Sequence, residues 1–448
     1  MEIRAAMVSE FFELKQRQTS VRVEVVAGLT TFLTMAYIIF VNPTILSAAG
    51  MDKQALIIVT CIVSGVMTII TGLFANAPIA MAPGMGLNAF LSYNLVIGGK
   101  ITWQAALGVV FLSGLLCWLL TLLGLRRRLV EAIPVGLVSA ISVGIGLFIT
   151  FIGLQDMGVI VKSEETLVTA GPLTGTVVIG LGGLLLMAFL EIRGIKGGLL
   201  IGMLFSTVLA IVVGFVAMPQ QLVSLDFDIS PVAFQLDIIG ALKWGLFGNI
   251  FALMFIDMFD SIGTLVACCH EAKMVDEKGT IRGLDRLLQI DAAASMLGAT
   301  LGTSSIASYI ESAAGIEEGG RSGLTSVVTG LCFFAALVFV PIVAVVPKYA
   351  TAPALIMVGL YMMKEIRRID FGNLEESFPA FIIMIMTALS YSISRGLAFG
   401  FISFVLIKAM SGRARQVKPT MWIIAVCCVL FLTLDKLPQL AEYLKGLI

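Results

Sequence analysis

Long apolar segments alternate with short polar stretches along nearly the whole chain. A first set of seven apolar segments lies at 24–41, 55–75, 79–97, 103–125, 136–154, 173–190 and 197–217. A second set of seven lies at 243–268, 287–302, 304–317, 324–346, 350–363, 377–393 and 396–410. Because a transmembrane helix needs about 20 apolar residues, this pattern predicts an all-α polytopic membrane protein with about fourteen transmembrane segments, some of which cross only in part.

Composition supports this interpretation. Hydrophobic residues make up 58% of the chain and charged residues 13%, whereas soluble domains carry about 25% charged residues. Lys plus Arg equals Asp plus Glu, at 29 each, and this balance argues against a nucleic-acid partner. The lipid membrane is therefore the expected environment. A last apolar run, 421–434, is short for a span, so the sequence leaves open whether it crosses the membrane or lies at the interface.

Basic residues gather in the loops that are cytoplasmic if the N-terminus lies inside. They include Lys273 to Arg286 together with Arg126, Arg127, Arg128, Arg193, Lys196, Lys364, Arg367, Arg368, Arg413, Arg415 and Lys418. The opposite loops are acidic and hold Asp156, Glu164, Glu165, Asp226, Asp228 and Asp237. The positive-inside rule therefore predicts a multi-pass protein of the cell (inner) membrane with a cytoplasmic N-terminus.

Two sets of seven segments enter the membrane with opposite orientations, which is typical of the inverted repeats of secondary transporters. The sequence thus predicts a 7+7 inverted repeat. Its expected parts are a cytoplasmic N-terminus (1–23), a first repeat (24–217), an outer linker (218–242), a second repeat (243–411) and a C-terminal tail with a short apolar segment (412–448).

The third and tenth segments are interrupted by polar and helix-breaking residues. In the tenth, Ser304 to Ser308 reads as extended chain and the helical pattern begins near Ser308 and Tyr309; the third contains Pro83, Gly84 and Gly86. Non-helical backbone at membrane depth is tolerated where it lines a cavity, and interruptions at matching positions of two repeats indicate a binding site. We expect each of these segments to combine an extended stretch with a half-helix, and the two to form a midplane site.

The eighth segment carries two acids, Asp257 and Asp260, which at i and i+3 share one side of a helix. Intramembrane acids usually line ion or substrate paths. Two neighbouring carboxylates in a low-dielectric medium do not both ionise readily, so one is expected to hold a proton. The pair is therefore a candidate for proton coupling. The alternative is that one Asp braces a neighbouring helix through Ser261 or Thr264.

Two further polar residues point to substrate binding. Glu311 would lie in the first turn of the tenth-segment half-helix, where its carboxylate could accept two N–H bonds from a flat heterocycle. Asn88 offers a donor and an acceptor toward the same cavity. The alternatives are a Glu311 satisfied by backbone N–H groups and an Asn88 that joins helices. Glu317 is interpreted as a helix-end charge on the cytoplasmic side.

No metal site or organic cofactor is predicted. His270 is the single histidine of the chain, so a histidine-based metal site lacks a second ligand. The expected coupling ion is H⁺, with Na⁺ left open.

Six stretches resemble the AzgA-like purine permeases, a branch of the nucleobase–cation symporter-2 (NCS2) family. They recur in family order over nearly the whole chain, and the polar letters of the tenth-segment string make it highly specific. The strings are AGLTTFLTMAYIIFVNP (27–43), APGMGLNAF (82–90), GIGLFITFIGL (144–154), DMFDSIGTL (257–265), GTSSIASYIESAAGIEEGGRSGLT (302–325) and ATAPALIMVGL (350–360).

The resemblance implies a core domain of segments 1–4 and 8–11 and a gate domain of segments 5–7 and 12–14. It implies purine contacts at Asn88, Asp257 and Glu311, with Asp260 as a second coupling acid. Ser308 and Tyr309, at the expected start of the half-helix, complete the predicted substrate-binding set. Ser308 stands where many relatives have Thr. Adenine, hypoxanthine and guanine all remain possible substrates.

The sequence therefore predicts a secondary active transporter, not an enzyme, that imports purine nucleobases by proton symport with an elevator-like movement. A homodimer through the gate domain is one possible assembly. Because 136–154 and 350–363 carry no charge, the interface between the two domains is expected to be smooth and apolar. The alternatives are a transporter of another nucleobase or small anion on the same fold and, with less support, an ion channel.

Overall fold

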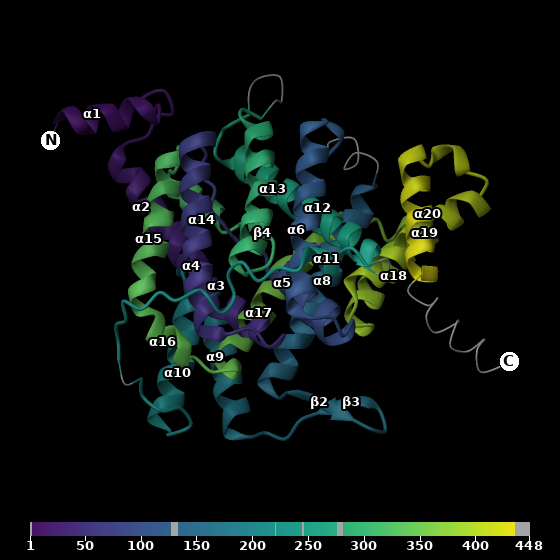
Figure 1. The fold of residues 1–448 in the computed structure, drawn as a ribbon, viewed down its shortest axis with the longest axis horizontal. Helices are drawn as coiled ribbons and strands as arrows, with labels where there is room; N and C mark the ends of the chain where they lie inside the picture. The colour runs from purple at the N-terminus through teal and green to yellow at the C-terminus, as the bar shows by residue number, and fades with distance from the viewer. Residues whose placement is uncertain (1, 127–132, 220, 244–245, 276–280, 435–448) are drawn as a thin grey trace.

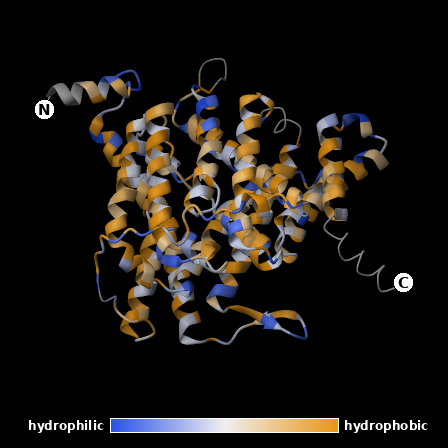
Figure 2. Cartoon of the chain, in the orientation of Figure 1, coloured by the Kyte–Doolittle hydropathy of each residue, from blue (hydrophilic) through white to orange (hydrophobic). Residues whose placement is uncertain are grey.

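Roughly parallel helices dominate the computed structural model, which describes residues 2–126, 133–219, 221–243, 246–275 and 281–434 (Figure 1). Apolar residues predominate along these helices (Figure 2). Within the described ranges, eight helices are long and apolar enough to cross a membrane by length and composition. The predicted class, an all-α polytopic membrane protein, is therefore confirmed.

The first repeat follows the predicted segments closely. Its elements, after the N-terminal helix α1 (Glu2–Phe11), are α2 (Val21–Met35), α3 (Ile38–Ser47), α4 (Lys53–Ile70), η1 (Thr71–Ala75), β1 (Met81–Pro83), α5 (Met85–Ala89), η2 (Phe90–Gly98), α6 (Trp103–Leu122), α8 (Val135–Met157), the hairpin β2 (Ile160–Ser163) and β3 (Leu167–Ala170), α9 (Gly175–Ile192) and α10 (Gly198–Val212).

The second repeat has the same plan, with a strand and a short helix as its third segment. The outer linker before it contains α11 (Ile238–Ala241). The elements of the second repeat are α12 (Phe247–Glu271), α13 (Leu284–Leu301), β4 (Ile306–Ser308), α14 (Ser312–Glu317), α15 (Gly323–Ala336), η4 (Leu337–Phe339), α16 (Val340–Val345), α17 (Lys348–Met363), η5 (Lys364–Arg368), α18 (Leu374–Leu389) and α19 (Ile393–Met410), followed by η6 (Ala414–Gln416) and α20 (Pro419–Leu434).

The two broken segments pair with each other at the centre of the fold. Strand β1 runs antiparallel to β4, with Met81 opposite Ser308 and Pro83 opposite Ile306. This pairing satisfies backbone groups that a lipid interior would leave without partners. Both predicted interruptions are thus confirmed. The half-helix, however, begins at Ser312 with Glu311 at its N-cap, later than predicted, because Ser308 is still paired as a strand.

The first segment is also broken, which the sequence did not predict. Helix α2 ends at Met35 and α3 begins at Ile38, so Ala36 and Tyr37 form a turn between them. The Thr34 hydroxyl donates to the carbonyls of Thr30 and Thr31, at 3.0 and 2.9 Å. Such back-bonding often bends helices, and here it directly precedes the break.

A buried acid fastens the start of the first segment to the eleventh. The Glu24 carboxylate is fully buried and accepts the backbone N–H of Arg321 at 2.9 Å and the Thr325 hydroxyl at 2.6 Å. It also accepts the Ser322 N–H. Because these donors belong to the first turn of α15 and the residues before it, Glu24 acts as a cap supplied by another segment.

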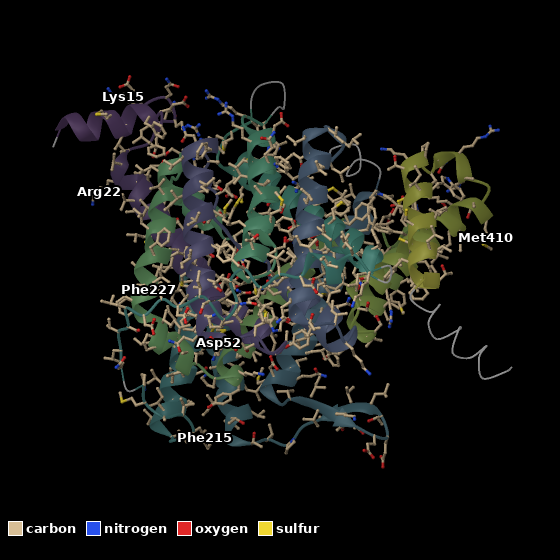
Figure 3. The ribbon with its side chains drawn as sticks, viewed as in Figure 1. Lys15, Arg22, Asp52, Phe215, Phe227 and Met410 are labelled. Carbon is tan, nitrogen blue, oxygen red and sulfur yellow. The ribbon has the colours of Figure 1, made fainter. Side chains whose placement is uncertain are left out.

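The helices pack as two groups. Helices α8, α9, α10, α17, α18 and α19 contact mainly one another. Helices α2, α4, α6, α12, α13, α14 and α15 form the second group, in which α4, α12 and α13 contact the β1–β4 pair. Close approach of α8 to α17 needs glycine: a Cβ on Gly359 would lie 1.9 Å from the Thr150 hydroxyl oxygen. Lys15 and Arg22 lie at the upper end of the molecule and Phe215 at the lower end (Figure 3).

Candidate functional site

A cavity of about 620 Å³ lies between the two helix groups. Residues of α2, α12 and the α14 region form one wall. Residues of α8, the α9–α10 loop, α17 and η5 form the other. The polar lining residues are Thr34, Ser139, Ser142, Glu191, Lys196, Asp260, Thr264, Glu311, Glu317, Tyr361, Lys364, Glu365 and Arg368. Two of the predicted site residues, Asp260 and Glu311, therefore line one cavity.

Glu311 enters the cavity from the junction between β4 and α14. Its carboxylate accepts a hydrogen bond from the Tyr37 hydroxyl, and Tyr37 is fully buried at the break between α2 and α3. Sequence reasoning did not single out Tyr37. The available signal was a phenol within the apolar run of the first segment, because a buried tyrosine usually gives its hydroxyl a partner.

Asp260 lines the cavity from α12, next to Phe259, Gly263 and Thr264. It is within electrostatic range of Asp291 and of Glu311. Asp260 and Glu311 are thus two of the five acids that line the cavity, and the other three are Glu191, Glu317 and Glu365.

Asp257 does not line this cavity, although it lies one turn before Asp260 on α12. It is 1% exposed and accepts a hydrogen bond from the Ser295 hydroxyl of α13 at 3.1 Å. Residues at i and i+3 point about 60° apart on a helix, and only one edge of α12 reaches the cavity. The structure places Asp257 on the α13 side and Asp260 at the cavity, and joint action of the two acids in proton coupling stays a prediction.

The charged neighbours of Asp257 are Asp291 and Arg126. Arg126 is 1% exposed; its Nη2 lies 3.0 Å from Asp291 Oδ2, and its Nη1 donates to the Leu288 carbonyl at 3.1 Å. Two carboxylates and one guanidinium are thus buried together. A buried charge is costly unless it is paired and hydrogen-bonded, so this cluster is a constraint on how α6, α12 and α13 pack.

Sequence reasoning missed this cluster. It placed Arg126 among exposed cytoplasmic charges, whereas the side chain turns back into the protein; Arg127 and Arg128 lie outside the described residues. Asp291 sits in the apolar run Ile290-Asp291-Ala292, and an acid in such a run was the one available signal.

The remaining predicted residues are buried outside the cavity lining. Asn88 is fully buried, and its Oδ1 accepts a hydrogen bond from the Ser304 hydroxyl. The Tyr309 hydroxyl donates to the Pro83 carbonyl at 2.6 Å, and Ser308 is 4% exposed within β4. These contacts hold the two broken segments against each other.

An ion pair connects the two walls of the cavity at its rim. Lys196 Nζ lies 2.7 Å from Glu317 Oε2, which joins the α9–α10 loop to the end of α14. The prediction of a wholly apolar interface is therefore wrong at this point, although Glu317 does end its helix as expected. A partly exposed ion pair loses little solvation, so the rim tolerates charges that the apolar α8 and α17 faces exclude.

The two inverted sets of segments, the paired broken helices and the cavity between two helix groups define a membrane permease. The chain belongs to the permease family Xan_ur_permease, whose model matches residues 22–399, and the resemblance to the AzgA-like purine permeases of the NCS2 family is confirmed. The chain is 41% identical over 425 residues to the adenine permease AdeP of Escherichia coli, covering 95% of each chain.

Two other relatives are also named as transporters of nucleobases. Identity to the guanine/hypoxanthine permease PbuG of Bacillus subtilis is 39% over 440 residues, covering 94% of this chain and 98% of the relative. Identity to the nucleobase transporter PlAzg2 of Paenibacillus larvae is 36% over 391 residues, covering 86% and 77%. The chain is thus a transporter and not an enzyme.

Solved structures confirm the fold. The transmembrane domain of the cyanobacterial bicarbonate transporter BicA matches with a TM-score of 0.63 at 16% identity, covering 83% of this chain and 96% of that one. The murine anion transporter Slc26a9 in its inward-facing state matches with a TM-score of 0.63 at 11% identity, covering 87% and 68%.

Proposed function

We propose that the chain is a secondary active transporter that imports purine nucleobases across the cell (inner) membrane by proton symport. The observation that carries the proposal is the pair of carboxylates, Glu311 and Asp260, facing one cavity between the two helix groups. Small-anion transport is the less favoured function, because the acids that line the cavity outnumber the basic residues, five to three, and an excess of negative charge repels an anion.

Glu311 is the proposed purine ligand. A purine presents ring and exocyclic N–H groups in one plane, and a carboxylate accepts two such donors side by side. Phe259, Val138 and Val358 line the same cavity and supply apolar surface for the ring faces. In this proposal Asn88, Asp257, Ser308 and Tyr309 belong to the substrate-binding unit by holding the broken segments in place.

Asp260 is the proposed proton-exchanging acid, because it lines the cavity from which water and substrate arrive. Asp257 is its proposed partner in coupling, acting from the buried cluster with Asp291 and Arg126. H⁺ is the proposed coupling ion. Sodium coupling is the competing outcome.

The two helix groups are the proposed moving parts. The core would consist of segments 1–4 and 8–11, and the gate of segments 5–7 and 12–14, which could also form a homodimer interface. Because the cavity lies at their border, sliding the core along the gate would change the membrane side to which it opens. Its rim includes Lys196, Lys364 and Arg368, all from loops predicted to be cytoplasmic, which supports an inward-facing state with the N-terminus inside.

The direct test is uptake of labelled adenine, hypoxanthine and guanine by cells that lack their own purine permeases, with unlabelled competitors. We expect saturable uptake of at least one purine, with loss of uptake in Glu311→Gln. The matched control is Glu318→Gln, which changes an exposed acid just beyond the same helix. Absence of purine uptake by a well-expressed, membrane-inserted protein would overturn the proposal.

A further inference from the structure

Two broken helices meet at the cavity through their N-caps. Tyr37 is the N-cap residue of α3, Glu311 is the N-cap residue of α14, and the Tyr37 hydroxyl donates to Glu311 Oε1. The two residues are 274 positions apart in the sequence. This contact links the first segment to the tenth at the carboxylate proposed to bind the purine.

Tyr37 stands behind the carboxylate. Its side chain is fully buried, and it is not among the residues that line the cavity, whereas Glu311 and Thr34 are. A ligand in the cavity therefore meets Glu311 and Thr34 first. Thr34, the next-to-last residue of α2, also approaches the Glu311 backbone carbonyl, at 3.5 Å.

Tyr37 supplies the one side-chain hydrogen bond recorded for the Glu311 carboxylate within the described residues. A phenol has a single O–H to donate, while a carboxylate offers about four acceptor positions. The Tyr37 hydroxyl occupies one position, the backbone N–H of Glu311 itself approaches another, and the remaining positions are left for a ligand. Because a hydrogen bond to an ionised acceptor is among the stronger ones, it also restricts the rotamers of a side chain that would otherwise be free to turn in the cavity.

We propose that Tyr37 is a positioning residue, which holds the Glu311 carboxylate in the orientation that accepts the N–H groups of a planar heterocycle. The inference rests on the proposed function of Glu311 and deepens it. Without the hydroxyl, the ligand itself has to immobilise the carboxylate, and ordering a mobile side chain on binding weakens affinity by roughly three- to tenfold.

The test is Tyr37→Phe, which keeps the buried ring and removes the hydroxyl. In vesicles, we expect KM for the purine to rise roughly three- to tenfold, while the maximal rate per folded transporter stays unchanged. The affinity of the purified protein for the purine, measured with labelled purine, should fall to the same extent. The matched control is Tyr93→Phe, because the Tyr93 ring packs against Phe148 and Tyr391 away from the cavity lining; its KM should not change.

A double-mutant cycle separates positioning from packing. If Tyr37 acts through Glu311, Tyr37→Phe should weaken binding clearly less in the Glu311→Gln background than in the native one. Equal losses in both backgrounds, or a fall in maximal rate with unchanged KM, overturn the inference and assign Tyr37 a packing role.

The single variants distinguish this inference from the function on which it rests. Weak binding by Glu311→Gln with normal binding by Tyr37→Phe overturns the positioning role alone. Normal binding by Glu311→Gln overturns the proposed role of Glu311 and the positioning role with it.

Discussion

The Lys196 ammonium lies 2.7 Å from the Glu317 carboxylate and so connects the loop between α9 and α10 to the last residue of α14. The two residues belong to different helix groups, and both line the cavity. Their side chains are 37% and 57% exposed, and an ion pair of this kind contributes about 0–1 kcal/mol. The contact is therefore weak enough to break in every transport cycle.

Covalent replacement of this contact should stop transport. With cysteines at Lys196 and Glu317, we expect a short bis-thiol reagent to block uptake, and a reducible reagent to allow recovery after reduction. The control places cysteines at Glu375 and Arg413, which form an ion pair outside the cavity lining, where a cross-link should leave uptake intact. Full uptake by a transporter cross-linked between Lys196 and Glu317 would contradict the sliding of core along gate.

Glu311→Gln should weaken purine binding about ten- to hundredfold, because loss of a hydrogen bond to a charged group costs about 1.5–3 kcal/mol. The amide keeps the shape of the side chain but replaces one acceptor with a donor. Equilibrium binding of labelled purine to purified protein measures the change. Unaltered affinity in protein of normal thermal stability would exclude Glu311 as the ligand.

Asp260→Asn should separate exchange from accumulation. An amide cannot release a proton, so net uptake driven by an inward proton gradient should collapse, while exchange of internal for external purine should be better preserved. Proteoliposomes with imposed gradients measure both activities. In the unmodified protein, a protonophore should abolish accumulation; sodium-dependent, protonophore-insensitive uptake would show that H⁺ is not the coupling ion.

Arg126→Met should destabilise the protein by about 3–5 kcal/mol, because it leaves Asp291 buried without its partner. The double change Arg126→Met with Asp291→Leu should recover much of that loss, since it removes both buried charges. Denaturant unfolding in detergent measures the free energies. Arg368→Met is the control, because its ion pair with Glu365 is exposed and should contribute about 0–1 kcal/mol. Equal losses for Arg126→Met and Arg368→Met would show that the buried pair contributes little.

Much of the fold was predictable because apolar runs and helix-breaking residues are local features of the sequence. Lipid requires backbone groups to be satisfied within each segment, so long apolar runs must become helices. The number of these runs, together with the basic residues in alternate loops, predicted the 7+7 arrangement. Pro83 and Gly84, and the run Ser304 to Ser308, disfavour a continuous helix, and both predicted interruptions are present as β1 and β4.

The environment of each polar side chain was decided only by the tertiary structure. Asp257 and Asp260 are equivalent on a helical wheel to within about 60°, yet one contacts Ser295 and the other faces the cavity. The rotation of α12 against α6 and α13 decides which of the two acids faces the cavity, and no local sequence pattern encodes that rotation.

Contacts between side chains far apart in the chain likewise could not be predicted from the sequence. The contact between Arg126 and Asp291 spans 165 positions, and the contact between Tyr37 and Glu311 spans 274. The sequence by itself determined which segments enter the membrane and where they break, because hydrophobicity and helix-breaking act within a few residues. Only the packed structure decided which groups stand behind the cavity, because a hydrogen bond or ion pair requires two atoms within about 3 Å, and that proximity exists only after the two repeats have folded against each other.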